Sequence, residues 1–137
     1  MEKNKKKVIV AEKQQWKKRT ELIEYIYSTL IKNSSLSEIK KDAFNSNLFD
    51  AYQLKIIEYY ADNKKKIINL ISEKLESTWT WERINIVEQA ILITAIAESK
   101  VTNIEKNIII DQAIISAKHY SEEKSIKYLN AILDKIL

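Results

Sequence analysis

Apolar residues recur every three or four positions along most of the chain, in long runs separated by short polar breaks. The most apolar run, Val87 to Glu98, has two adjoining apolar faces at helical spacing: Ile84, Val87, Ile91 and Ala95 on one, and Ile86, Ala90, Ile93 and Ala97 on the other. A helix that is apolar over most of its circumference is normally buried. This run is also too short and too polar at its ends to span a bilayer. We therefore expect a central helix in a helical core, with Ile91 and Ala95 fully buried.

Four helices are predicted before the central one, at about Glu12–Lys32, Ser35–Phe44, Leu48–Tyr60 and Lys64–Glu76. Ser35 and Glu38 have the spacing of a capping box, in which each side chain accepts a hydrogen bond from the other residue's backbone N–H. The pair Asp62–Asn63 suggests an N-cap for the fourth helix.

Two more helices are predicted after the central one. Thr102 and Glu105 have capping-box spacing before a helix that ends near Ala117, and Ser121 is the expected N-cap of the last helix. The pattern predicts an all-α fold with at least six helices and no sheet, in a single domain over residues 1–137. Residues 1–10 are expected to form a flexible basic tail, and we favour a solvated tail over an arm that contacts phosphates.

The composition excludes several kinds of catalytic and ligand site. The 137 residues include no cysteine, glycine or proline, so disulfides, thiolate metal sites and glycine-rich phosphate loops are ruled out. His119 is the only histidine. The carboxylates alternate with lysines, which is typical of ion pairs on exposed helix faces. We expect a binding protein, not an enzyme, with no metal and no cofactor.

The net charge of +4 and the pI near 9.1 permit an anionic partner without requiring one. No secretory leader pattern and no apolar run of membrane-spanning length occur in the sequence. We expect a soluble cytoplasmic protein that does not bind membranes.

Two stretches in the second half of the chain, Val87 to Glu98 and Ile108 to Leu137, resemble conserved stretches of the NusB family. Val87-Glu88-Gln89-Ala90-Ile91-Leu92, followed by Ala95, Ile96 and Glu98, is similar to the family pattern V-D/E-x-A-I-L-R-x-A-x-Y-E-L. The tail IIIDQAIISAKHYSEEKSIKYLNAILDKIL is similar to VAINEAIELAKxFGxExSxKFVNGVLDKI. The similarity covers about Trp81 to Ile136. A weaker similarity at the start of the chain involves Arg19, Leu22, Ile23, Ile26 and Tyr27.

This resemblance implies about seven helices in two small bundles, bridged by the first helix, and a role in transcription antitermination. It implies binding to the single-stranded boxA element of ribosomal RNA, together with the ribosomal protein NusE and with other elongation factors as further partners. Carried over by position, Glu88 would contact the ribosomal protein. The RNA-binding candidates are Lys17, Arg19, Tyr27, Lys124 and Tyr128.

These residue types suit RNA, because cations neutralise phosphates and aromatic rings stack on unpaired bases. Each also has an ordinary structural alternative: core packing for the tyrosines, solvated surface charge for Lys17 and Arg19, and pairing with a lysine for Glu88. If the RNA-binding interpretation holds, the starts of the first and last helices should lie close together.

The sequence departs from the family pattern at Ile93, where the family has arginine, and at Ala97, where it has tyrosine. Only Arg19 and Arg83 are arginines, and lysine lacks the planar fork of arginine. A second hypothesis is therefore a protein-interaction module that has lost sequence-specific RNA binding. A third is a subunit that acts in trans on ribosomal RNA, because some ribosomal RNA cytosine methyltransferases carry a NusB-like domain.

Overall fold

The computed structural model describes residues 14–137, and all of its regular structure is helical over that range. The elements are α2 (Gln15–Lys32), α3 (Leu36–Asn45), α4 (Ala51–Glu73), the 3₁₀ turn η1 (Trp81–Arg83), α5 (Ile86–Val101), α6 (Lys106–Ala117) and α7 (Glu123–Ile136). The all-α prediction with at least six helices and no sheet is confirmed for these residues. The predicted basic tail, residues 1–10, lies outside the described residues.

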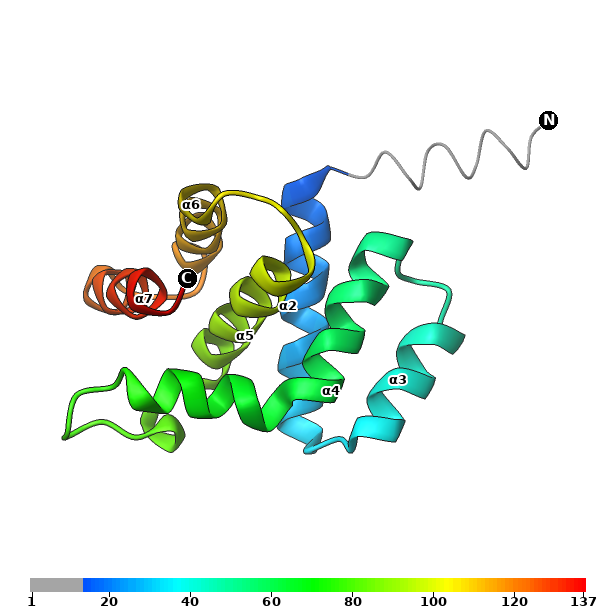
Figure 1. Cartoon of the computed structure of the whole chain (residues 1–137), viewed down its shortest axis with the longest axis horizontal. Coiled ribbons are helices and arrows are strands. Elements are labelled where there is room, and N and C mark those ends of the chain that lie inside the picture. Colours follow the sequence, from blue (N-terminus) through cyan, green and yellow to red (C-terminus); the bar gives the residue numbers. More distant parts are fainter. Residues whose placement is uncertain (1–13) are drawn as a thin grey trace.

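Helix α5 is the centre of the molecule (Figure 1). It contacts α2, α4, α6 and α7, and every residue from 88 to 98 is buried. Ile91 and Ala95 are 1% and 4% exposed, so the predicted burial of both is confirmed.

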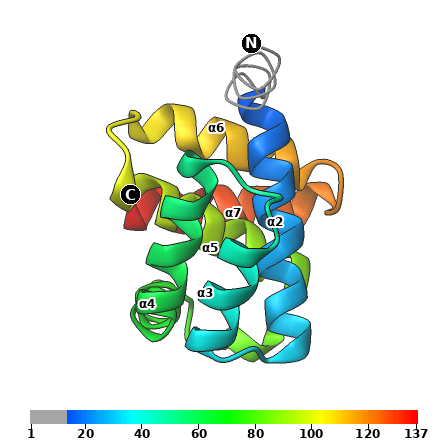
Figure 2. The same ribbon diagram turned by 90° about the vertical axis from the view of Figure 1, so that its right-hand side faces the viewer.

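Two groups of helices lie on opposite sides of α5 (Figure 1). Helices α2 and α3 and the first part of α4 lie on one side, α6 and α7 lie on the other, and the second part of α4 passes below α5 toward α7. Figure 2 shows α3 and α4 in front of α5, with α2 running along them. Buried side chains from all six helices belong to one continuous hydrophobic core. No described helix has the length and apolar character that a membrane crossing requires.

The helix ends show how a chain without glycine terminates its helices. The predicted capping box is present, because the Ser35 hydroxyl accepts from the Glu38 amide and the Glu38 carboxylate accepts from the Ser35 amide. Asn33 ends α2 in the left-handed region, at φ 52°. Asparagine is one of the few residues besides glycine that adopt this conformation readily, so it replaces the glycine cap.

The third and fourth predicted helices are one bent helix, α4, so the predicted N-cap at Asp62–Asn63 is wrong. The bend lies at Asn63, where φ is −125° and ψ is 19°. The Asn63 side-chain amide donates to the Tyr59 carbonyl, four residues earlier, at 3.0 Å. The side chain therefore satisfies a carbonyl at the bend instead of starting a new helix, and Figure 1 shows the change of direction within α4.

Two further predicted caps are wrong. Helix α6 begins after Glu105, which makes no side-chain cap, and the Thr102 hydroxyl donates to the Glu98 carbonyl at the end of α5. Helix α7 begins after Glu122, and the Ser121 hydroxyl donates instead to the Glu88 carboxylate at 2.7 Å. In both cases the hydroxyl bonds to α5: Thr102 to the end of the helix that it terminates, and Ser121 to the first turn.

Candidate nucleic-acid interface

A groove lined by aromatic and charged side chains lies where η1, the start of α5 and the α6–α7 connection meet. Its volume is about 530 Å³, within the range of roughly 300–1,000 Å³ that is usual for ligand sites. We call it the aromatic groove, and it is lined by Trp79, Arg83, Ile84, Asn85, Glu88, Tyr120, Ser121, Glu122, Lys124, Ser125 and Tyr128. Three of the predicted site residues, Glu88, Lys124 and Tyr128, therefore lie in one groove.

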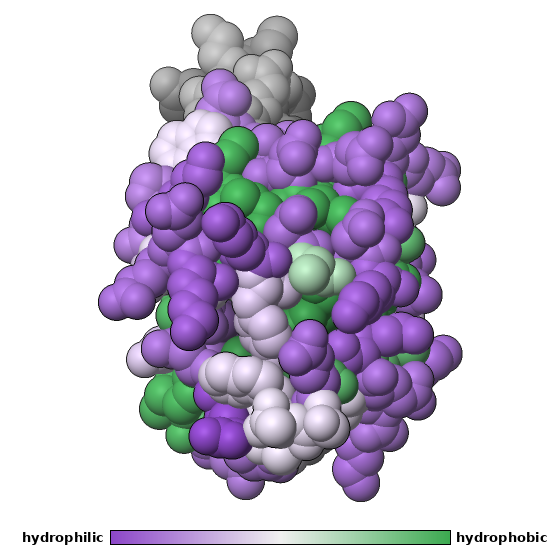
Figure 3. All heavy atoms as spheres, turned by 90° about the vertical axis from the view of Figure 1, so that its left-hand side faces the viewer, coloured by the Kyte–Doolittle hydropathy of each residue, from purple (hydrophilic) through white to green (hydrophobic). Residues whose placement is uncertain are grey.

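Figure 3 shows the side of the molecule formed by α6, α7 and the end of α4. Pale side chains, the colour of aromatic, serine and threonine residues, gather in its lower half and are surrounded by hydrophilic side chains. This face therefore combines stacking groups with charge.

The wall of the groove is a stack of a cation and two aromatic rings. The rings of Trp79 and Tyr128 lie 5.5 Å apart, and the Arg83 guanidinium lies 5.5 Å from the Trp79 ring centre. The Thr78 carbonyl accepts a hydrogen bond from Arg83 at 2.8 Å, which fixes the guanidinium. Trp79 remains 42% exposed, so part of its ring is available to a ligand.

Tyr128 is half-buried, so it fits neither full core packing nor full exposure for base stacking, which are the two interpretations that the sequence allowed. Burial, followed by the nearby Glu88 and Glu76 carboxylates, raises the pKa of its phenol. Its hydroxyl is buried and has no hydrogen-bond partner among the described residues. The ring packs on Trp79, so Tyr128 belongs both to the core edge and to the groove wall.

A second hollow of about 420 Å³ adjoins the aromatic groove through Tyr120, which lines both. It is lined by Ile23, Glu24, Tyr27, Val87 and Tyr120. Tyr120 is 46% exposed and Tyr27 is 36% exposed. Tyr27 is thus connected through Tyr120 to Lys124 and Tyr128, and both tyrosines that line the second hollow are exposed.

Lys17 lies further along the same helix. It is exposed, and it lies ten residues before Tyr27, roughly 15 Å along the axis of α2. Ten residues fall about 80° short of three full helical turns, so the two side chains project from neighbouring faces of α2 and not from one stripe. The part of α2 that borders this surface runs from Ile23 to Tyr27, where it meets Tyr120 of the α6–α7 connection.

The expectation that Arg19 is a solvated surface charge is wrong. Arg19 is 6% exposed, and its Nε and Nη2 atoms donate to the two carboxylate oxygens of Glu98 at 2.9 and 2.8 Å. The Gln112 side chain accepts from Nη1 at 3.5 Å, and the Tyr52 hydroxyl donates to the same Glu98 carboxylate. These bonds join α2 to α4, α5 and α6 at the end of α5 opposite to Glu88.

A second buried pair lies beside the first. Lys18 and Asp50 are 3.1 Å apart, and the Lys18 ammonium lies 5.1 Å from the centre of the Tyr52 ring. Of the three cations at positions 17 to 19, only Lys17 is exposed. The basic start of α2 is therefore mainly structural.

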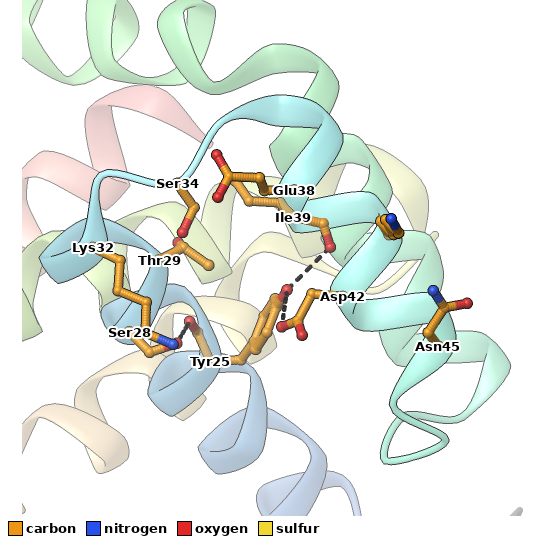
Figure 4. Close-up of a pocket in the computed structure, with 10 residues that line it drawn as sticks. Tyr25, Ser28, Thr29, Lys32, Ser34, Glu38, Ile39, Asp42 and Asn45 are labelled. Atoms are coloured by element: carbon orange, nitrogen blue, oxygen red, sulfur yellow. Dashed lines mark hydrogen bonds between the residues drawn. The ribbon is translucent and has the colours of Figure 1, made fainter.

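A polar hollow of about 400 Å³ separates α2 from α3 (Figure 4). Tyr25 reaches across it from α2 and donates to the Ile39 carbonyl at 3.0 Å and to Asp42 at 3.2 Å. Its lining carries acidic and basic residues together, including Glu38, Asp42 and Lys32. These contacts hold α3 against α2, and none of the predicted site residues lines this hollow.

Burial makes the protein sensitive to alkaline pH, because it raises the pKa of Tyr25, Tyr52, Tyr60 and Tyr128. In the unfolded chain these phenols lose their protons near pH 10. The stabilisation is therefore fully present below about pH 10 and is lost as the pH rises above it. We expect the free energy of unfolding in urea to be steady from pH 8 to about 9.5 and to fall steeply above about 10.5. Unchanged stability at pH 11 would contradict the burial of these hydroxyls.

No group of three or more His, Cys, Asp or Glu side chains that could hold a metal ion occurs among residues 14–137. His119 is exposed, with its ring 6.5 Å from that of Tyr120. This places it at the edge of the surface described above, with no carboxylate partner in the described structure.

Sequence reasoning did not single out Trp79, Arg83 or Tyr120 as site residues. All three lie in or beside connecting segments, where helical periodicity gives no information. Large aromatic residues in such segments, flanked by basic residues, are a signal that could have identified them.

The fold and this surface together define an all-helical protein of the NusB type. A sequence model described as the NusB family matches residues 17–137. The chain is 30% identical over 122 residues to the transcription antitermination protein NusB of Oceanobacillus iheyensis, covering 88% of this chain and 96% of that protein. It is 33% identical over 123 residues to the protein of the same name from Borreliella burgdorferi, covering 82% of this chain and 85% of that one.

Among solved structures, NusB of T. maritima superposes with a TM-score of 0.73 at 26% identity, covering 90% of this chain and 89% of that one. The family match spans most of the chain, and the structural match spans both bundles. The chain belongs to the NusB family.

Proposed function

We propose that this chain is a cytoplasmic transcription antitermination factor that binds the boxA element of ribosomal RNA together with the ribosomal protein NusE. The observation that carries the proposal is the meeting of Lys124, Tyr128 and, through Tyr120, Tyr27 on one connected surface. Relatives that match over most of their length are named transcription antitermination proteins, which supports the same role. Other elongation factors are further candidate partners.

Single-stranded RNA suits this surface physically. Aromatic rings offer stacking to any unpaired base, and a strand without a complementary partner can splay its bases into hollows. Lys124 and the exposed Lys17 supply charge that neutralises phosphates and releases counterions. We assign no phosphate contact to Arg19, because its guanidinium is already paired with Glu98 inside the protein.

The partner contact is the less supported half of the proposal. The resemblance assigns Glu88 to the ribosomal protein, but Glu88 is 9% exposed and its carboxylate accepts from Ser121. The alternative function, a protein-interaction module without sequence-specific RNA binding, is favoured by one observation. The arginine at the basic start of α2 is buried, so that end presents less positive charge than the resemblance implies.

Binding of a labelled boxA RNA, measured by fluorescence anisotropy with and without the cognate ribosomal protein, tests the proposal. We expect the chain alone to bind weakly, and the added ribosomal protein to tighten binding by about 10-fold or more, or ~1.4 kcal/mol. A scrambled RNA of the same length should show a smaller gain. Equal binding of boxA and scrambled RNA in both conditions would favour the interaction module.

A further inference from the structure

Two acidic residues, Glu88 and Glu122, line the aromatic groove, although carboxylates are unexpected in a site for a polyanion. Glu88 lies on the first turn of α5, and its Oε2 accepts from the Ser121 hydroxyl at 2.7 Å. Within residues 14–137, neither Lys124 nor Arg83 forms an ion pair with it. A carboxylate has about four acceptor positions, and Ser121 occupies one. Glu88 therefore keeps acceptor capacity at a groove lined by aromatic rings.

Glu88 lines the aromatic groove, whose volume of about 530 Å³ can admit a small ligand such as one nucleotide. Trp79 and Tyr128 form an aromatic wall, and the exposed Tyr120 lies at the boundary with the neighbouring hollow. Lys124 and Arg83, both exposed, line the same groove and can approach a phosphate. Because Glu88 lines the same groove as Trp79 and Tyr128, a base that stacks on the wall can turn its polar edge toward the Glu88 carboxylate.

The chemistry of a carboxylate distinguishes among the four RNA bases. Guanine presents two adjacent donors, N1–H and the exocyclic amine, which match the two oxygens of a carboxylate. Uracil offers one N–H between two carbonyls. Adenine and cytosine place a ring-nitrogen acceptor beside their amine, which would repel the second carboxylate oxygen.

We propose that the aromatic groove holds one unpaired guanine of the bound RNA, with Glu88 reading its two-donor edge and Trp79 and Tyr128 stacking on its ring. This rests on the proposed RNA-binding function. It also gives Glu88 a contact with RNA in place of the protein contact that the family resemblance implies. Ser121 is a positioning residue, because its hydroxyl orients the carboxylate without reaching the base.

Trp79 provides the readout. In a Trp16→Phe, Trp81→Phe background, the only remaining tryptophan is Trp79, and its emission should be quenched when a base stacks on it. The probe is an oligouridine heptamer with one central guanine, compared with heptamers that carry inosine or adenine there. Inosine lacks only the exocyclic amine, so it removes one of the two donors. We expect the guanine heptamer to bind about 10-fold more tightly than the inosine heptamer, or ~1.4 kcal/mol.

Glu88→Gln should bring the three heptamers to within about 2-fold of one another, because the amide replaces one acceptor by a donor. Ser121→Ala should reduce the guanine preference while keeping the Glu88 charge, and should lower the melting temperature only modestly because it removes a single hydrogen bond. It gives a second test if Glu88→Gln is unstable. Glu58→Gln, an exposed acid on α4, is the matched control and should leave the preference intact.

The outcomes separate the inference from the function on which it rests. Salt-dependent binding of all heptamers without a guanine preference overturns the inference and leaves RNA binding standing. A guanine preference that survives in Glu88→Gln also overturns the inference. If that variant has lost binding to the ribosomal protein, Glu88 contacts the protein and not the RNA. Absence of binding to every heptamer and to boxA RNA overturns both.

Discussion

Arg19→Ala is expected to lower the free energy of unfolding by about 3–5 kcal/mol, because it leaves the Glu98 carboxylate buried without its cation. Glu98 is 1% exposed, and Arg19 contributes two of the hydrogen bonds to its oxygens. The substitution also removes the hydrogen bond that Arg19 on α2 donates to Gln112 on α6. Urea unfolding followed by circular dichroism measures the change.

Two variants serve as controls for this prediction. Lys17→Ala removes an exposed charge two residues away and should change stability by less than about 0.5 kcal/mol. Arg19→Lys keeps the charge but loses the planar fork, so its cost should lie between the other two. A loss below about 1 kcal/mol for Arg19→Ala would mean that the pair does not hold the two helix groups together.

Tyr128→Ala should weaken RNA binding by about 1–3 kcal/mol without changing its salt dependence, because stacking involves no counterion release. Tyr128→Phe is the matched control. It keeps the ring and removes a buried hydroxyl that has no hydrogen-bond partner within residues 14–137, so both the melt and the RNA affinity should be retained. Anisotropy titrations at several salt concentrations, with a thermal melt of each variant, give the result.

Lys124→Ala should behave in the opposite way, lowering affinity for all RNAs and reducing the salt slope by about 1. Lys124 is exposed, so its truncation should leave the melt unchanged. If Tyr128→Ala binds RNA as the parent does while folding normally, the aromatic groove is not the RNA site.

Helical periodicity predicted most of the fold because burial depends on it directly. The helical periodicity of the apolar residues in Val87–Glu98 predicted α5 and its burial, and the spacing of Ser35 and Glu38 predicted a capping box that is present. The spacing of Thr102 and Glu105 predicted a second capping box, which is absent from the start of α6. A hydroxyl between two helices can accept from the backbone N–H groups of the helix that follows or donate to a carbonyl of the helix that precedes it. The spacing alone does not decide between the two, and Thr102 bonds to the preceding helix.

The site was predictable in residue type but not in arrangement. The predicted residues Lys124, Tyr128 and Glu88 do line one groove. The pairing of Arg19 with Glu98 could not be predicted, because the two residues lie 79 positions apart in the sequence. Long-range pairing of this kind leaves no local pattern. Trp79 and Tyr120 became visible as site residues only when the connecting segments were placed around the start of α5.

Photo-crosslinking of the chain to boxA RNA, with the crosslinked residues identified by mass spectrometry, tests most directly whether the aromatic groove is the RNA-binding surface. The account predicts crosslinks at Trp79, Tyr120 and Tyr128, with Tyr27 at the far end of the same surface. Crosslinks confined to the α2–α3 hollow around Tyr25, with none at the groove, would contradict it.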